Sequence, residues 1–260
     1  MSAITLGDDA GDTTHFGSLD LTGAAVTVTE DSGTVLAGVS ASSLDLTSNG
    51  NITQTGAVAI GGTTTLDAGG TTAGTNNIML DNTANAFNSV IITQGGDITL
   101  ADADSLTLGS VTTGGLLSAT VDANNDGTST LTVSAAISAG TSVTLSGSAA
   151  LNDIVDINAD ITAGTSLTME NASSILIDAS GTRALTARMA ISTLMEPEPS
   201  DRSRSAVVGS SIWMPTGTAT SSPPASLTLS THCRRICSSM QKVASTSTRS
   251  IWMTVPATGC

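Results

Sequence analysis

The chain has 260 residues, of which 12% are charged and 2% are aromatic, and its formal net charge is −14. Globular domains carry about 25% charged residues, so this is not the composition of an ordinary enzyme. No run of about 18 apolar residues occurs, so we expect no membrane span. The N-terminal residues lack the basic and apolar segments of a signal peptide.

The composition changes sharply near Thr182. Residues 1–182 contain 19 acidic residues and no lysine or arginine, whereas residues 183–260 contain all 8 basic residues, all 6 prolines and 3 acidic residues. The first part therefore has a formal charge of −19 and the second of +5. We interpret residues 1–182 as a repeat region and residues 183–260 as a compositionally distinct tail, which we expect to be disordered.

Two interpretations of the tail stay open. Trp and Met each have a single codon, TGG and ATG. If the reading frame is shifted so that a codon starts at the last base of TGG, a Trp-Met pair reads GAT, which encodes Asp. Residues 211–217 then become rich in Asp and Gly, like Val121–Gly127. The tail is thus either the same repeat in a shifted reading frame or a genuine Ser/Thr/Arg-rich tail.

Because the charge of the first part repels phosphate, we expect no nucleic-acid partner.

Short apolar-x-apolar segments recur through residues 1–182, separated by Gly, Asn, Asp, Ser and Ala. This period-two alternation places the apolar pair on one face of a strand and Thr or Asp on the other. Helical spacing is nowhere sustained, so the sequence predicts an all-β fold. The predicted strand cores are Leu19–Leu21, Val26–Val28, Leu44–Leu46, Val58–Ile60, Ile78–Leu80, Ile98–Leu100, Leu106–Leu108, Leu131–Val133, Val143–Leu145, Val155–Ile157 and Leu167–Met169.

The predicted strands also recur at longer intervals. Residues 137–145 (ISAGTSVTL) match residues 161–169 (ITAGTSLTM) at a spacing of 24 residues, and Val58, Ile78 and Ile98 follow one another at a spacing of 20. Periods of about 20–50 residues are typical of solenoids. One such coil buries too few side chains to be stable alone, so neighbouring coils must stack. At about 20–24 residues per coil, the sequence predicts a β-helix of about eight coils over residues 1–182.

Three segments resemble the repeats of filamentous haemagglutinin-type proteins, namely Asn51–Gly56 (NITQTG), Val58–Gly69 (VAIGGTTTLDAG) and Asn82–Gln94 (NTANAFNSVIITQ). Those proteins are large bacterial surface and secreted adhesins with right-handed β-helical shafts. The resemblance covers about residues 1–182 and implies a right-handed parallel β-helix with a structural or adhesive role. The secretion signal and export domain of that family do not occur here, so we expect an internal fragment of an extracellular or outer-surface protein.

A polysaccharide-binding or polysaccharide-processing β-helix protein is the alternative interpretation. Enzymes of this kind use paired carboxylates, together with cations that stabilise negative charge and aromatic platforms for sugars. Residues 1–182 contain no Lys, Arg, Tyr or Trp, and their acids occupy mostly turns and outward strand positions. We therefore expect no enzyme activity and no catalytic residue. A groove with facing carboxylates would favour the alternative.

One segment has the pattern of a metal-binding turn. Asp122, Asn124 and Asp126 precede Gly127 and match the first half of a calcium loop, where oxygens at positions one, three and five surround the ion. An EF-hand needs Glu at position twelve, where Val133 stands. A calcium-stiffened turn and a plain Asx/Gly corner both stay open. We expect no cofactor other than Ca²⁺.

The charge of the repeat region also bears on its partners. An acidic rod without basic residues repels itself unless salt or divalent cations screen it, as extracellular fluid does. We expect its partners to be a surface protein or a glycan of a host or neighbouring cell. Lateral self-association of the rods is a further expectation.

Overall fold

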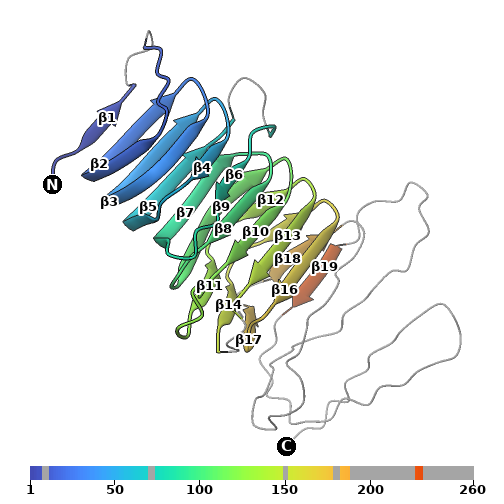
Figure 1. Ribbon diagram of the computed structural model, residues 1–260. Helices are drawn as coiled ribbons and strands as arrows, with labels where there is room; N and C mark the ends of the chain where they lie inside the picture. The colour runs from blue at the N-terminus through green and yellow to red at the C-terminus, as the bar shows by residue number, and fades with distance from the viewer. Residues whose placement is uncertain (8–11, 70–73, 149–151, 178–181, 188–225, 231–260) are drawn as a thin grey trace, which may run out of the picture.

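The computed structural model describes residues 1–7, 12–69, 74–148, 152–177, 182–187 and 226–230. These residues form strands and no helix, and the strands stack into a parallel β-helix of about eight coils (Figure 1). The predicted all-β, parallel β-helical fold is therefore confirmed. No helix in the described ranges is long and apolar enough to span a bilayer.

The strands follow one another around each coil and are mostly short. All eleven predicted strand cores lie within them. The strands are β1 (Ile4–Leu6), β2 (Leu19–Glu30), β3 (Thr34–Ser48), β4 (Ile52–Gln54), β5 (Val58–Asp67), β6 (Ile78–Leu80), β7 (Ala86–Gln94), β8 (Ile98–Ala101), β9 (Leu106–Thr113), β10 (Leu117–Thr120), β11 (Thr130–Val133), β12 (Ile137–Ala139), β13 (Ser142–Ser146), β14 (Ile154–Ile157), β15 (Ile161–Ala163), β16 (Ser166–Glu170), β17 (Ser174–Ile177), β18 (Thr182–Ala187) and β19 (Ser226–Ser230).

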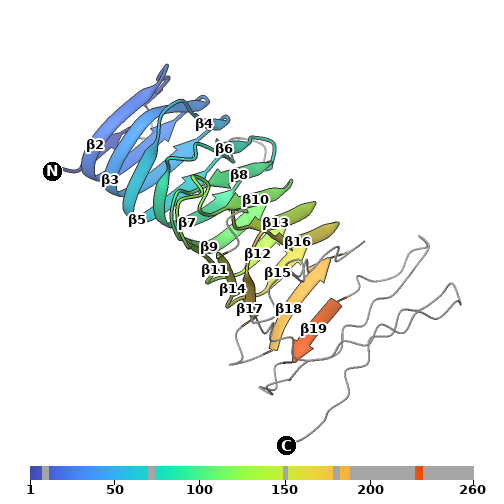
Figure 2. The same cartoon turned by 60° about the horizontal axis from the view of Figure 1, so that its bottom comes forward.

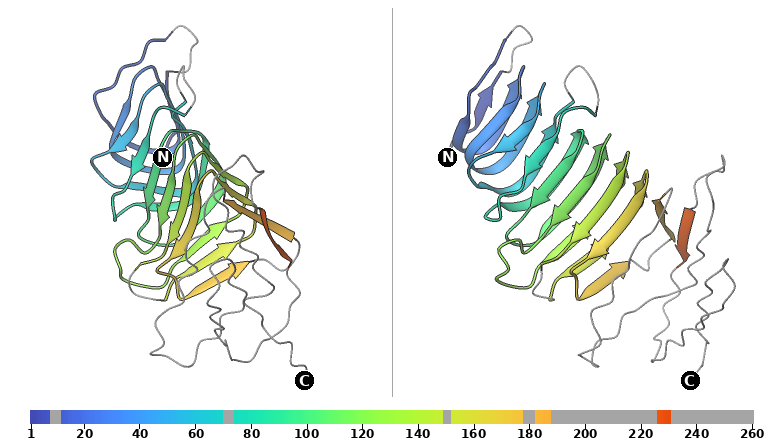
Figure 3. Two further views of the ribbon diagram at one scale, coloured as in Figure 1. Left: turned by 90° about the vertical axis from the view of Figure 1, so that its right-hand side faces the viewer. Right: turned by 45° about the vertical axis from the view of Figure 1, so that its right-hand side comes forward.

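One side of the rod, which we call the first side, consists of β4, β6, β8, β10, β13 and β16 in parallel register (Figure 2). The long strands β2, β3, β5, β7 and β9 bend around each coil. β3 begins on the first side, where Thr34–Leu36 pair with β4, and continues along β5. Later coils use two separate strands there. β9 marks the change, because it pairs with β11 through Leu106–Leu108 and with β12 through Val111–Thr113 (Figure 3).

The core is a continuous aliphatic column along the rod. On the first side, Ile52, Ile78, Ile98, Leu117 and Val143 lie one above another, and each is at most 1% exposed. Full burial of such a side chain stabilises the fold by about 1.5–3 kcal/mol relative to exposure. Because each side chain packs against the coil above and the coil below, no coil is stable without its neighbours.

The register settles which repeats are equivalent. Ile137 pairs with Ile161 and Leu145 with Met169, as the 24-residue match predicts. The 20-residue spacing of Val58 and Ile78 does not place them at equivalent positions, because Val58 pairs with Val39 in β3 whereas Ile78 pairs with Ile52 and Ile98. The coils differ in length, so equal spacing in the sequence does not always mean equal position in the coil.

The predicted boundary at residue 182 falls at the last described coil. β18 pairs in parallel with β15, and β19 pairs with β18 in the antiparallel sense (Figure 2). The rest of the predicted disordered tail, residues 188–225 and 231–260, lies outside the described residues.

Candidate functional site

Four buried polar side chains line one edge of the rod, at the turns that follow the first side. We call these turns the first corner; they link β6 to β7, β8 to β9, β10 to β11 and β13 to β14. Asn85, Asp102, Asp122 and Asp153 lie in successive turns of this corner, and each is 0% exposed. Buried polar groups require hydrogen-bond partners, so their contacts define what the corner does.

Three of these side chains connect one coil to the coil before it. In each case a side-chain oxygen accepts the N–H of a residue at or next to the start of a strand in the preceding coil. The pairs are Asn85 with Val58 (2.9 Å), Asp102 with Phe87 (2.6 Å) and Asp153 with Ser129 (2.7 Å). Asn85 also donates to the carbonyls of Leu80 and Ala101, at 3.2 and 3.1 Å.

Asp102 is an acid buried without a cation. Its second oxygen accepts the N–H of Asp104 at 2.8 Å. Burial raises the pKa of Asp102 from 3.8 to about 6, although the N–H groups of Phe87 and Asp104 lower it. Residues 1–182 contain no Lys or Arg, so hydrogen bonds alone stabilise its charge.

Asp122 belongs to the turn for which the sequence suggests calcium. Its Oδ1 accepts the N–H groups of Asp126 and Gly127, and its Oδ2 accepts the Ser148 hydroxyl at 2.6 Å. The Ser148 hydroxyl and the two N–H groups lower the pKa of Asp122, against the opposing effect of burial. Asp122 therefore holds the turn from inside as an ionised acceptor.

The other two predicted calcium ligands are exposed and contact each other. Asn124 donates its Nδ2 to Oδ2 of Asp126 at 2.8 Å. The described residues contain no group of three or more His, Cys, Asp or Glu side chains placed to hold a metal. A cation at this turn would have to displace hydrogen bonds that already occupy Asp122, which fits the plain Asx corner better. The calcium-stiffened turn stays a prediction.

A hollow of about 400 Å³ lies over the same corner, and both Asp81 and Asp122 line it. A two-carboxylate hydrolase needs one carboxyl group that is protonated before the reaction. Asp122 does not suit that role, because its pKa is lowered.

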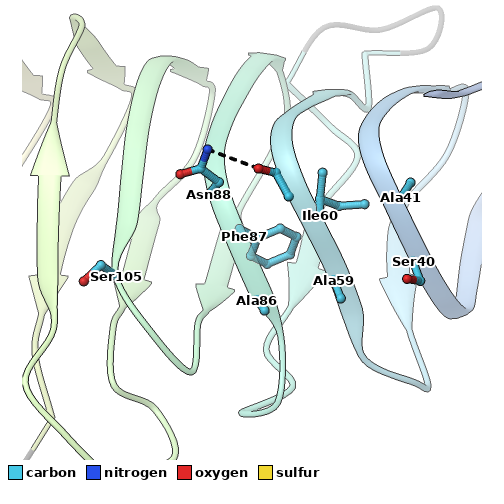
Figure 4. A pocket seen from close by; sticks show the side chains of 9 residues that line it. Ser40, Ala41, Ala59, Ile60, Ala86, Phe87, Asn88 and Ser105 are labelled. Atoms are coloured by element: carbon cyan, nitrogen blue, oxygen red, sulfur yellow. Dashed lines mark hydrogen bonds between the residues drawn. The ribbon is translucent and has the colours of Figure 1, made fainter. Parts of the chain in front are cut away.

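A second hollow, of about 560 Å³, lies on the outer face of β3, β5 and β7. Register aligns Ser40, Ala59 and Ala86, whose short side chains leave a depression above Phe87 (Figure 4). Asn88 borders it and donates to the Gly61 carbonyl at 3.3 Å. The residues that line this hollow are small, apolar or hydrogen-bonding, and none of them is ionisable.

The burial of four acids was not predicted from the sequence. We expected the acids mostly at turns and outward positions, but Glu30, Asp102, Asp122 and Asp153 are at most 1% exposed. A turn acid that points inward has the same local sequence as one that points outward. The position of these acids in the sequence could have indicated their burial, because Asp102 and Asp122 both follow within two residues of the end of a buried strand on the first side.

Comparison with known proteins locates a repeat within the β-helix. A family model described as repeats of unknown function (DUF5649) matches residues 23–94. That segment extends from β2 to the end of β7 and includes the strands around the larger hollow. No curated protein and no solved structure matches the chain significantly. Over residues 23–94 the chain is therefore similar to a family of repeats, and it folds them as stacked coils.

Proposed function

We propose that this chain is a structural or adhesive shaft segment of a large bacterial surface or secreted protein. The observation that carries the proposal is the aliphatic column along the rod, which joins about eight coils into one elongated body. A solenoid of this kind propagates by stacking identical contacts and presents a long repetitive surface. Those are the properties of a spacer that holds a binding surface away from a cell.

The outer face of the first side supports the adhesive part of the proposal. Register aligns Thr99, Ser118, Thr144 and Thr168 in one row of half-buried hydroxyl side chains. Hydroxyl groups both donate and accept hydrogen bonds. A row of them on successive coils offers a protein or glycan the same contact once per coil.

We further propose that the segment is not an enzyme and acts outside the cell. The hollow above Phe87 has no ionisable lining, and Asp122 in the other hollow already accepts three hydrogen bonds. The charge of −19 over residues 1–182 favours a medium with enough salt or divalent cation to screen it.

The test uses the full 260-residue chain. Beads coated with it are expected to adhere to immobilised surface proteins or glycans more strongly than beads coated with albumin. The same protein, incubated with neutral and acidic polysaccharides, is expected to release no reducing ends. Release of reducing ends that Asp81→Asn abolishes would overturn the proposal.

A polysaccharide-binding function is the second candidate, and the hollow above Phe87 favours it. Ala59 is exposed at its centre, so Ala59→Gln would fill the depression without touching the core. Ala136→Gln is the matched control, since Ala136 is exposed and does not line the hollow. If the hollow binds glycan, Ala59→Gln lowers retention on a polysaccharide column and Ala136→Gln leaves it unchanged.

A further inference from the structure

The segment Asn51-Ile52-Thr53 has a feature that a shaft function does not use. It matches the acceptor pattern Asn-x-Ser/Thr for attachment of a sugar to asparagine, with a residue other than Pro in the middle. Asn51 is exposed at the turn before β4, Ile52 is buried and Thr53 is half-buried. The two residues of the pattern that matter to a modifying enzyme therefore share the outer face of the coil.

We propose that Asn51 is an N-glycosylation site. Its side-chain nitrogen Nδ2 attacks the anomeric carbon of a sugar activated as a glycosyl diphosphate. The new C–N bond forms as the C–O bond to the diphosphate breaks; the diphosphate carrier leaves, and one Nδ2 proton passes to a base of the transferring enzyme. No oxidant or metal redox step is needed, and the inference is independent of what the shaft binds.

The hydrogen bonds of Asn51 are compatible with the modification. Its Oδ1 accepts the N–H of Asn77 at 2.8 Å, and Oδ1 of Asn77 accepts the N–H of Asp97 at 2.8 Å. These bonds link successive coils through carbonyl oxygens. Among the described residues, Nδ2 of Asn51 donates no hydrogen bond. A sugar on Nδ2 leaves the carbonyl oxygen in place, so the link between the coils is preserved.

The chain contains two natural comparisons. Asn77 occupies the same position one coil further on, but Met79 follows it where Thr53 follows Asn51. Asn171-Ala172-Ser173 also fits the acceptor pattern, but Nδ2 of Asn171 donates to the Ser146 hydroxyl at 3.1 Å. One Nδ2 proton of Asn171 is therefore already engaged, and a sugar could replace only the other one. Asn51 therefore combines the Asn-x-Ser/Thr pattern with an Nδ2 that donates no hydrogen bond.

The experiment is peptide mass spectrometry of the full chain recovered from the cells that make it. Trypsin has no cleavage site before Arg183, so an acid-specific protease is used instead. The expected result is a mass increment of one or more sugar residues on the peptide that contains Asn51. Wild-type protein with Asn51 unmodified would overturn the proposal.

Four variants make the assignment specific. Asn51→Gln and Thr53→Val are expected to abolish the increment, Thr53→Ser to retain it, and Met79→Thr to add a second increment at Asn77. Thr53→Val leaves the contact between Asn51 and Asn77 intact, so its loss of sugar does not reflect misfolding; circular dichroism checks this. An increment on Asn51 that survives Thr53→Val would contradict the proposal.

Discussion

Thr64 sits in the aliphatic column with an unused hydroxyl. It aligns with Leu44 in the coil before and Val90 in the coil after, and it is 0% exposed. Its Oγ1 is the one buried side-chain oxygen or nitrogen in the described residues without a hydrogen-bond partner. A buried hydroxyl without a partner costs about 1–3 kcal/mol. The unpaired hydroxyl of Thr64 therefore lowers the stability of the fold, and a side chain of the same shape without the hydroxyl would avoid this cost.

Thr64→Val is expected to raise the free energy of unfolding by about 1 kcal/mol, because it keeps the shape and removes the unpaired hydroxyl. Urea denaturation measures the change. Thr65→Val is the control, since Thr65 is the next residue on the outer face, where surface substitutions stay within about 0.5 kcal/mol. An equal gain in both variants would mean that β-propensity, and not the orphan hydroxyl, is responsible.

Asp102 is expected to make stability fall as pH rises from 4 to 7. Its pKa in the folded chain, about 6, is above the ordinary 3.8, so the folded state holds the proton more tightly than the unfolded state. Its contribution is fully present below about pH 4 and is lost as pH rises through about 6. At about 1.4 kcal/mol per pKa unit, the loss is at most about 3 kcal/mol.

The measurement is the urea midpoint at several pH values for wild type and Asp102→Asn. The variant is expected to lack the decline between pH 4 and 6. Asp45→Asn is the control, because Asp45 is exposed on β3 and its removal should leave the decline in place. Asp122 acts in the opposite direction: its lowered pKa gives stability that is lost only as pH falls below its ordinary value.

Among the elements, the first corner is where one side chain connects three coils. Asn85 accepts from Val58 in the coil before, contacts its own coil at Leu80, and donates to Ala101 in the coil after. It also exchanges hydrogen bonds with Gln54, at 2.8 and 3.0 Å. These contacts make Asn85 the most connected side chain of the corner.

Asn85→Ala is expected to lower the free energy of unfolding by about 3 kcal/mol, because it leaves a buried N–H and two buried carbonyls without their partner. Thermal unfolding followed by circular dichroism measures it. Asn88→Ala is the matched control, since Asn88 is exposed and has a single 3.3 Å contact. Similar losses in the two variants would show that the corner does not depend on Asn85.

Strands and their stacking followed from the sequence because apolar alternation and the 24-residue match report directly on backbone register. Ile137 and Ile161 pair as predicted. The corners did not follow, because their conformation depends on contacts between coils that the local sequence does not contain. The Gly61-Gly62 pair illustrates this: it suggests a turn, but both residues lie within β5, at a shift in its register with β3 and β7. Buried Asp153 is a second case.

At the scale of the whole molecule, unscreened acid charge dominates the electrostatics. Residues 1–182 carry 19 acids and no lysine or arginine. Raising NaCl from 0.01 to 0.1 M shortens the screening length from about 30 to about 10 Å. The melting temperature of the full chain is therefore expected to rise over that range, and a fall would contradict the account of charge repulsion.

Calcium is tested against NaCl of equal ionic strength in the same assay. A calcium-stiffened turn would add a further rise in melting temperature that Asp126→Asn abolishes and Asp45→Asn, outside the turn, does not. The hydrogen bonds of Asp122 favour equal effects of the two salts once ionic strength is matched.

The unequal coils have a practical consequence for anyone who wishes to alter this molecule. The link from β8 to β9 takes four residues and the link from β10 to β11 takes nine, yet Leu106 and Leu131, which follow these links, remain in register. The turns between strands therefore accommodate differences in the number of residues per coil. The exposed residues 124–128 are therefore a natural place to graft a foreign epitope, and repeating the graft at other turns would display copies at fixed intervals along a single scaffold.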